Sequence, residues 1–337
     1  MEAVIEFSGL INFLQNSGGK HFVLCDENTF ANCYHEFCKQ VGEPMQPIVI
    51  KVGETQKNIN TCELVWQTLL EHQAGKDAIL INLGGGVVSD IGGFVAATYK
   101  RGIKYVNVPT SLLAMVDAAT GGKTGVNFKH LKNIIGVIKQ PEMVMIHVPF
   151  LKTLPTQHLR NGFAEMFKHA LLKGTQEVTH LMNEIDITQH FNEKVILKSL
   201  AIKEAIVAQD PTEKGLRKIL NLGHTIGHAI EFASQEAGEE ILHGEAVALG
   251  LIAAIKLSVI KMNFDHIEAE NIIKFIRIHY TTPSWIRLNH RAILQAVLQD
   301  KKNSEQQINM VLLQAAGKPF YDVICTVEEI EKVLIEI

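Results

Sequence analysis

The sequence predicts an α/β N-terminal domain of the Rossmann-like type with a parallel sheet, followed by a mostly α-helical C-terminal domain. Its 337 residues exceed the length at which a single hydrophobic core usually stops growing, about 250–300 residues. Short runs rich in Val and Ile alternate with helix-length segments over the first part of the chain, as in βαβ units. After residue 153 the apolar positions recur at helical spacing. We therefore expect domains at residues 1–153 and 154–337.

Five apolar runs are the expected strands of the first domain: Phe22–Cys25, Ile48–Val52, Ala78–Leu83, Tyr105–Val108 and Met143–Val148. Helix-length segments such as Asn60–Glu71 and Leu112–Ala119 separate most of them. In the second domain the spacing predicts helices over Phe163–Leu172, Val195–Gln209, Thr225–Phe232, Ala246–Ile260 and Ile267–Ile278. Two late segments, Ile308–Leu313 and Tyr321–Cys325, are expected to be extended and to form a hairpin.

Composition excludes several classes of protein. With 47% hydrophobic and 20% charged residues, the chain can form a substantial core. The 32 Lys and Arg against 36 Asp and Glu give a net charge of −4, which argues against a nucleic-acid partner. The longest apolar run, Ala246–Ile255, is too short to span a membrane, and the acidic N-terminus is unlike a signal peptide. Five cysteines without a CxxC pair suggest free thiols, so we expect a cytoplasmic protein.

Two glycine-rich segments of the first domain favour a phosphate-containing ligand. Gly84–Ser89 joins an expected strand to an expected helix, where backbone N–H groups can contact a phosphate. This segment lacks the third glycine of a dinucleotide fingerprint, so a tight turn without a ligand remains an alternative. The second segment contains Gly121–Thr124, but Asp117 stands where a P-loop needs its first glycine. We interpret Asp117–Asn127 as a flexible loop that binds an anion.

The helical half carries a candidate metal site. His224 and His228 stand at i and i+4, so both imidazoles can project from adjacent helical turns toward one ion. His243 follows at the start of another apolar segment. Spacing alone therefore indicates a Zn²⁺ site made by His224, His228 and His243, with Glu165 as a candidate fourth ligand. The alternative is a set of unrelated structural histidines.

Six basic side chains near these motifs are candidate anion binders: Arg101, Lys123, Lys168, Lys203, Arg217 and Lys318. Taken singly, each is expected to be a solvated surface charge. Gathered at one site in an acidic chain, they would imply a small substrate that carries phosphate and carboxylate groups.

Seven segments bring these motifs together in a fixed order: Gly84–Asp90, Val108–Asn127, Lys132-Asn133, Gly162–His169, Asp210–Arg217, Asn221–His228 and His243–Glu245. In this order the chain resembles the 3-dehydroquinate synthase family of sugar-phosphate cyclases over nearly its whole length. The resemblance implies conversion of 3-deoxy-D-arabino-heptulosonate 7-phosphate, a phosphorylated sugar acid, to 3-dehydroquinate and phosphate in the shikimate pathway. It also implies a lyase that needs NAD and a divalent metal, Zn²⁺ or Co²⁺.

The resemblance further implies a role for individual residues. The NAD site would comprise Asp26, Asn28, Glu54, Lys57, Gly85, Gly86, Val87, Val88, Asp90, Thr110, Ser111, Asp117, Lys123, Lys132, Phe150, Thr153 and Asn161. The catalytic set would be Lys123, Lys168, Lys203, Glu213, Asn221 and His228, and the substrate-binding set Arg101, Asp117, Asn133, Arg217 and Lys318. The metal ligands would be Glu165, His224 and His243, which moves His228 from the metal to the substrate. Arg101 would face across a dimer interface, so a homodimer is expected.

Three other functions remain as alternatives at this point. The nearest is a sugar-phosphate cyclase that forms a valiolone or an inosose, although Lys203, Arg217, Asn221 and His228 fit the dehydroquinate pattern. A metal-dependent polyol dehydrogenase would have little use for so many phosphate-binding cations. A regulatory NAD-binding protein would have little use for the metal ligands. The sequence departs from the family pattern in three places: Ser89 replaces a usual glycine, Pro211 replaces a usual acid, and Ala118-Ala119-Thr120 varies a stretch that is often Ser-rich.

Overall fold

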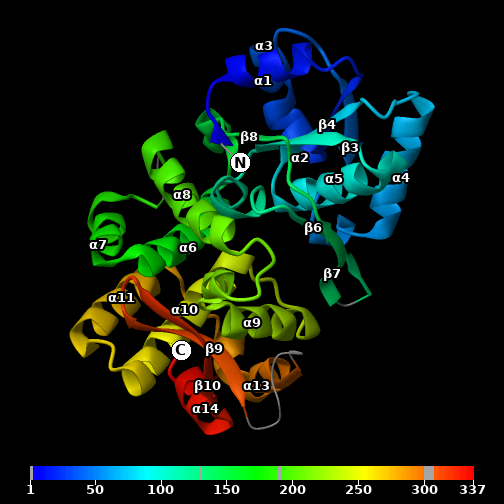
Figure 1. The fold of residues 1–337 in the computed structure, drawn as a ribbon. Helices are drawn as coiled ribbons and strands as arrows, with labels where there is room; N and C mark the ends of the chain where they lie inside the picture. The colour runs from blue at the N-terminus through cyan, green and yellow to red at the C-terminus, as the bar shows by residue number, and fades with distance from the viewer. Residues whose placement is uncertain (1–2, 130, 188–190, 300–306) are drawn as a thin grey trace. The chain divides into compact units, whose positions relative to one another are not determined.

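The computed structural model describes residues 3–129, 131–187, 191–299 and 307–337. The chain divides into two compact units (Figure 1). The first unit spans Met1–Leu159 with Asn192–Ile196, and the second spans Arg160–Phe191 with Leu197–Ile337. The expected fold class is confirmed, because the first unit is α/β with a parallel sheet and the second is mostly helical.

A parallel sheet of six strands forms the centre of the first unit, in the order β1-β8-β5-β4-β2-β3. Its strands are β1 (Ala3–Val4), β2 (His21–Asp26), β3 (Gln46–Ile50), β4 (Ile79–Gly84), β5 (Lys104–Pro109) and β8 (Met143–Met145). All of β4 is buried, as expected for a central strand covered on both faces. The five predicted strands are confirmed. The sequence did not reveal β1, because two residues are too short to show a periodic pattern.

Helices cover this sheet: α1 (Phe7–Gln15), α2 (Glu27–Thr29), α3 (His35–Val41), α4 (Ile59–Glu71) and α5 (Gly86–Thr98). Shorter 3₁₀ or π turns lie at Phe30–Tyr34, Glu54–Gln56, Tyr99–Arg101, Ala114–Ala118 and Val148–Thr153. Apolar side chains of α4 and α5, such as Val65 and Ile91, share one buried cluster with those of β2, β3 and β4. In place of the helix predicted over Leu112–Ala119, the structure has a short π turn at Ala114–Ala118.

A separate antiparallel hairpin replaces the expected flexible loop. Strand β6 (Lys123–Phe128) pairs with β7 (Leu131–Ile138), so the prediction of a flexible loop is wrong from Lys123 onward. The segment is rich in Gly, Lys and Asn, which conceals its extended conformation. Gly125 faces Gly136, and a Cβ on Gly125 would lie 2.5 Å from the backbone oxygen of Ile135. Every residue of β7 is exposed. Figure 1 shows the course of the β6–β7 hairpin.

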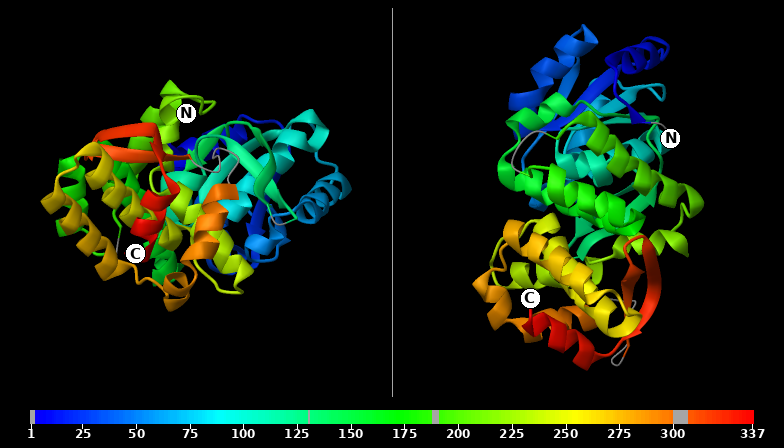
Figure 2. Two further views of the ribbon diagram at one scale, coloured as in Figure 1. Left: turned by 90° about the horizontal axis from the view of Figure 1, so that it is seen from below. Right: turned by 90° about the vertical axis from the view of Figure 1, so that its left-hand side faces the viewer.

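The second unit contains most of α6 (Thr156–Lys173) and of α8 (Glu193–Gln209), whose first residues belong to the first unit. Its other elements are α7 (Thr175–Glu184), a 3₁₀ turn at Leu216–Asn221, α9 (His224–Glu236), α10 (His243–Met262), α11 (His266–His279), α12 (Ser284–Leu288), α13 (His290–Gln299) and α14 (Val327–Ile335). The antiparallel hairpin of β9 (Ile308–Ala315) and β10 (Lys318–Cys325) completes it and confirms the predicted late hairpin (Figure 2, red). None of the described helices combines the length and the apolar composition that a bilayer span requires.

Close packing of α9 against α10 brings the starts of these two helices together. A Cβ on Gly250 would lie 2.0 Å from the backbone oxygen of Gly223, and a Cβ on Gly227 would lie 3.1 Å from the Cα of Val247. Only glycine therefore permits this approach at Gly250. The consequence is local to the second unit: His224 and His243, the first residues of α9 and α10, face each other with ring centroids 5.4 Å apart.

Candidate functional site

The residues expected to bind a dinucleotide follow the carboxyl ends of neighbouring strands in the first unit. Asp26 ends β2, and Gly85 and Gly86 follow β4 at the start of α5. Thr110 follows β5, and its N–H donates a hydrogen bond to the Gly84 oxygen at 3.1 Å. In parallel sheets these ends lie at one edge, which is where open α/β sheets bind ligands. The first N–H groups of a helix lack partners within the helix, so those at the start of α5 suit a phosphate there.

The other expected NAD residues of the first unit are Asn28, Glu54, Lys57, Val87, Val88, Asp90, Ser111, Asp117, Lys123, Lys132, Phe150 and Thr153. Lys57 and Asp90 form an ion pair that is largely shielded from solvent. Ser89 does not obstruct the glycine turn, because its hydroxyl donates to the Gly86 oxygen at 3.1 Å. Asn161 is the exception in the set, since it belongs to the second unit.

Asn127 is a residue that the sequence analysis did not assign. Its side-chain amide donates to Glu54 Oε1 at 2.9 Å, and its N–H donates to the Lys57 oxygen at 2.7 Å. Its side-chain oxygen accepts the Asn133 N–H at 2.9 Å. Through its backbone and its side chain, Asn127 thus connects two expected NAD residues with an expected substrate residue. The unpredicted β6–β7 hairpin brings Asn127 to these residues, so the spacing of motifs in the sequence could not indicate its contacts.

Three of the expected substrate or catalytic residues have left-handed backbone conformations. The φ angles are 64° for Arg101, 53° for Asn133 and 58° for Glu213. Asn tolerates this region, whereas Arg and Glu adopt it at a cost of about 1 kcal/mol or more. Such strain persists where the surrounding structure requires it, and it is concentrated at functional sites.

A buried carboxylate lies at the centre of the candidate metal site. Glu165 on α6 is 0% exposed, and neither of its oxygens accepts a hydrogen bond of good geometry from the described residues. Nε2 of His224 lies 3.5 Å from Glu165 Oε1, and Nε2 of His243 lies 3.6 Å from the same oxygen. Ligands of a tetrahedral ion with bonds of about 2.1 Å are about 3.4 Å apart. The arrangement of the three side chains therefore fits a divalent ion.

Both histidines are held through their other ring nitrogen. His224 Nδ1 lies 3.2 Å from the Leu222 oxygen, and His243 Nδ1 lies 3.0 Å from Glu231 Oε2. A ring that donates from Nδ1 presents the lone pair of Nε2 to an ion. Glu231 was also missed by the sequence analysis. The signal that could have found it is a carboxylate within the apolar pattern of α9.

The charges around Glu165 keep it ionised without an ion. Burial alone would raise the pKa of Glu165, but Lys168, His224 and His243 outweigh burial and hold it well below its ordinary value. Burial and the charge of Lys168 lower the pKa of His224 well below its ordinary value. Burial also opposes the charged form of His243, yet Glu165 and Glu231 raise its pKa to about 10. Neighbouring charges thus shift the pKa values of all three proposed metal ligands.

His228 occupies a different position from the other two histidines. It is exposed, with its ring 5.2 Å from that of His224 and 5.8 Å from that of His243. Its ligand atom and theirs lie within 4.8 Å of one another, so the set of three histidines remains compatible with a metal. The buried Glu165, with Nε2 of His224 and of His243 within 3.6 Å of its Oε1, favours the other set of ligands, which excludes His228.

Three of the expected catalytic and substrate-binding cations are buried in the second unit. Lys168 is 1% exposed and pairs with Glu165, while Lys203 and Arg217 are also buried. Burying a charge is costly unless it is paired or used to bind a ligand. Lys318, the remaining basic residue of the substrate set in this unit, is exposed at the start of β10.

Asp210 organises the loop that carries Glu213 and Arg217. Its carboxylate accepts N–H groups of Lys214, Gly215 and Arg217 at 3.1, 2.7 and 3.1 Å. Glu213 Oε1 accepts the Asn221 side-chain amide at 2.9 Å. Pro211, which stands where the family usually has an acid, takes part in this loop, because its backbone oxygen accepts a hydrogen bond from Arg217 Nη1 at 2.8 Å.

Asn161 lies beside the metal cluster. Its side-chain oxygen accepts the Gly244 N–H at 2.5 Å, and a Cβ on Gly244 would lie 1.9 Å from the backbone oxygen of Asn161. The contact fixes the start of α10 against α6, directly after His243. The side chain that was expected to bind NAD thus supports a metal-site helix.

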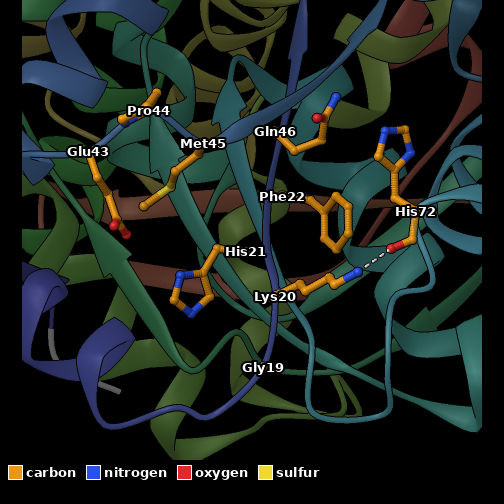
Figure 3. A pocket seen from close by; sticks show the side chains of 9 residues that line it. All are labelled: Gly19, Lys20, His21, Phe22, Glu43, Pro44, Met45, Gln46 and His72. Carbon is orange, nitrogen blue, oxygen red and sulfur yellow. Dashed lines mark hydrogen bonds between the residues drawn. The ribbon is translucent and has the colours of Figure 1, made fainter.

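A surface hollow in the first unit is distinct from these residues. It is lined by Lys20, His21, Glu43, Gln46 and His72 among others (Figure 3). His21 and Gln46 begin β2 and β3, so the hollow lies at the amino ends of these strands. The expected dinucleotide residues follow the opposite, carboxyl ends.

Comparison with known proteins gives consistent matches over most of the chain. The family described as 3-dehydroquinate synthase N-terminal matches residues 47–161, and the one described as 3-dehydroquinate synthase C-terminal matches residues 162–303. A 3-dehydroquinate synthase of Parabacteroides distasonis is 38% identical over 301 residues, which are 88% of this chain and 85% of the relative.

Two solved structures have a similar fold. A 2-deoxy-scyllo-inosose synthase complexed with carbaglucose-6-phosphate, NAD⁺ and Co²⁺ is similar with a TM-score of 0.87 and 23% identity, covering 99% of this chain and 96% of that one. The 2-epi-5-epi-valiolone synthase of Streptomyces hygroscopicus, with NAD⁺ and Zn²⁺ bound, is similar with a TM-score of 0.78 and 25% identity. It covers 94% of this chain and 90% of that one.

Proposed function

Because the chain belongs to the 3-dehydroquinate synthase family, we propose that it converts 3-deoxy-D-arabino-heptulosonate 7-phosphate to 3-dehydroquinate and phosphate. This would make it a carbon–oxygen lyase of the shikimate pathway. The observation that carries the proposal in the structure is the buried Glu165, which has two histidine Nε2 atoms within 3.6 Å of one oxygen and a buried lysine beside it.

We propose NAD and a divalent metal, Zn²⁺ or Co²⁺, as cofactors. Glu165, His224 and His243 would hold the metal, and the carboxyl edge of the parallel sheet would hold NAD. The support is the geometry of both places and the NAD⁺ with Co²⁺ or Zn²⁺ in the two similar structures. When bound, the metal would polarise a substrate hydroxyl, and NAD would accept a hydride and later return it.

The cations of the chain would bind and orient the anionic substrate. Lys168, Lys203 and Arg217 are buried, so an anion that reaches them exchanges water for fixed positive groups. His228, Asn221 and Lys318 would add donors, and Arg101, Asp117, Lys123 and Asn133 are proposed as further substrate-contacting residues. A substrate with both a phosphate and a carboxylate matches this excess of cations.

Glu213 would help to fix this set. Its carboxylate accepts a hydrogen bond from Asn221 at 2.9 Å and lies 3.9 Å from Arg217 Nε. It thus restrains two donors before the substrate arrives. Preorganised donors stabilise developing charge at little further cost, which is the contribution expected for an elimination of phosphate.

We further propose that the protein is a homodimer and that it works in the cytoplasm. Strand β7 exposes Ile134, Ile135, Val137 and Ile138 along a strand whose described sheet partner is β6. An exposed apolar edge strand is a site for association, and a second copy of the chain is the expected partner. The five cysteines are free thiols, as suits a reducing compartment.

One assay tests the proposed reaction. Purified protein with NAD⁺, Zn²⁺ and the heptulosonate phosphate should release inorganic phosphate without accumulating NADH. Steady formation of NADH would instead indicate a polyol dehydrogenase. Turnover with sedoheptulose 7-phosphate alone would indicate a valiolone-forming cyclase. Replacing Glu165 by Gln should abolish phosphate release, whereas undiminished function would favour a role that needs no metal.

A further inference from the structure

Glu231 is a buried carboxylate in an otherwise apolar part of α9. It is 7% exposed, and its neighbours Ile230 and Ala233 are buried as well. Its Oε2 lies 3.0 Å from Nδ1 of His243, which begins the next helix of the second unit. Burying a carboxylate costs several kcal/mol unless hydrogen bonds or charges compensate. The contact with His243 is therefore the reason to ask what this residue does.

We infer that Glu231 is a positioning residue of the metal site, holding His243 through Nδ1 so that Nε2 faces Glu165. This inference rests on the metal site of the proposed function. The two ends of the imidazole have different partners: Glu231 at Nδ1 and Glu165 at Nε2, at 3.0 and 3.6 Å. Rotating the ring away would break both contacts at once.

The comparison between the two histidines explains why a carboxylate is needed for one of them. His224 follows Gly223 directly, so the backbone oxygen of Leu222 reaches its Nδ1 at 3.2 Å. For His243 the acceptor at Nδ1 comes instead from another helix, as the carboxylate of Glu231. A carboxylate acceptor also increases the basicity of the ligating nitrogen more than a neutral oxygen does.

Asn161 supports the same residue by a second route. Its hydrogen bond to the Gly244 N–H fixes the backbone at the start of α10. It leaves the side-chain torsions of His243 undetermined, and those are what Glu231 restrains. Backbone and ring are thus held by different residues, so the two contributions can be separated by mutation.

The test uses metal affinity as its readout. Metal-free full-length protein is titrated with Co²⁺, followed by its visible absorption, and with Zn²⁺ in competition with a chromophoric chelator. We expect Glu231→Ala to weaken binding about 100-fold and Glu231→Gln, which keeps an acceptor oxygen, about 10-fold. Both variants should change the Co²⁺ spectrum. The dissociation constant for NAD⁺ should stay at the wild-type value.

Glu236→Gln is the matched control, because Glu236 is an exposed carboxylate on the same helix. It should bind Co²⁺ like the wild type. If Glu231→Ala does not fold, as judged by circular dichroism, the isosteric Glu231→Gln carries the test. Wild-type affinity and an unchanged spectrum in the folded variants would overturn the inference. Absence of Co²⁺ and Zn²⁺ binding by the wild type would instead overturn the metal site itself.

Discussion

Single residues of the second unit combine burial with charge to an unusual degree. Glu165, Lys168 and Arg217 are all at most 3% exposed. A fold built for stability alone would place apolar side chains there, because buried ion pairs seldom stabilise more than well-packed hydrophobic residues. Burial of these charged groups therefore favours a functional role over a purely structural one, and substitution of single residues can measure their contributions.

Lys168→Ala should slow turnover more than it weakens NAD⁺ binding. Lys168 pairs with Glu165 in the second unit, so we expect its charge to act at the proposed metal site and on the substrate there. Loss of one such group costs about 10²–10³-fold in kcat, whereas the dissociation constant for NAD⁺ should change little. Steady-state kinetics and NAD⁺ titration check this. Lys198→Ala, a half-exposed lysine paired with Glu177 at 3.4 Å, is the control. Equal losses in turnover and NAD⁺ affinity would contradict the role.

Asp210→Asn should reveal a pH-dependent contribution to stability. Backbone N–H groups, with that of Gly215 first, lower the pKa of Asp210 in the folded chain. A lowered folded pKa stabilises the protein above the pKa of the unfolded state, about 3.9, and the effect is lost as the pH falls through the folded value. The free energy of unfolding of the wild type should therefore exceed that of the variant at pH 5–7. The difference should disappear as the pH falls below about 4.

Urea unfolding across this pH range measures the difference. Glu63→Gln, at an exposed position on α4, serves as the control and should follow the wild type throughout. A constant difference between wild type and Asp210→Asn down to pH 2 would show that the carboxylate charge is irrelevant.

At the scale of elements, the distance between α9 and α10 sets the distance between two proposed ligands. Gly250 is the position where this packing is tightest, with a hypothetical Cβ 2.0 Å from the Gly223 oxygen. Gly→Ala in a helix ordinarily stabilises by up to about 1 kcal/mol. Here the atom in the way belongs to the backbone, so one helix must move.

Gly250→Ala should accordingly destabilise the chain by about 1–3 kcal/mol, as other overpacked cores do, and weaken Zn²⁺ binding. Chemical denaturation and metal titration give the two values. Gly18→Ala is the control, because a Cβ there meets nothing within 4 Å. Unchanged Zn²⁺ affinity in a folded Gly250→Ala variant would show that the two helix starts are positioned independently of this contact.

Periodicity predicted the elements whose burial is regular, and it failed where burial is irregular. The parallel strands were evident as continuous apolar runs, because both faces of β4 are buried. The β6–β7 hairpin was not, because Gly125 and Gly136 give no side-chain alternation and β7 is exposed throughout. The sequence suggested candidate ligands, but helical spacing alone favoured His228 over Glu165. The position of the buried Glu165 carboxylate becomes evident only in the structure, where α6 brings it close to the starts of α9 and α10.

At the scale of the whole molecule, β7 leads to a test of the assembly. The protein should sediment as a dimer of the 37.4 kDa chain. Ile134→Lys with Ile138→Lys should yield monomers, because two buried cations would have to lose their hydration at the interface. Ile267→Lys on α11, at a residue that is 71% exposed, should leave the dimer intact. Analytical ultracentrifugation distinguishes the outcomes, and a wild-type monomer at micromolar concentration would contradict the proposal.

Lys100, Arg101 and Gly102 follow one another with φ angles of 47°, 64° and 117°. Stability alone would favour glycine or asparagine at the middle position, since arginine gains nothing there from its own backbone. Under random mutation Arg101 would drift toward those residues. If the guanidinium group of Arg101 is needed for activity, a library of variants at this position should return arginine when it is screened for activity, and glycine or asparagine when it is screened for folding alone.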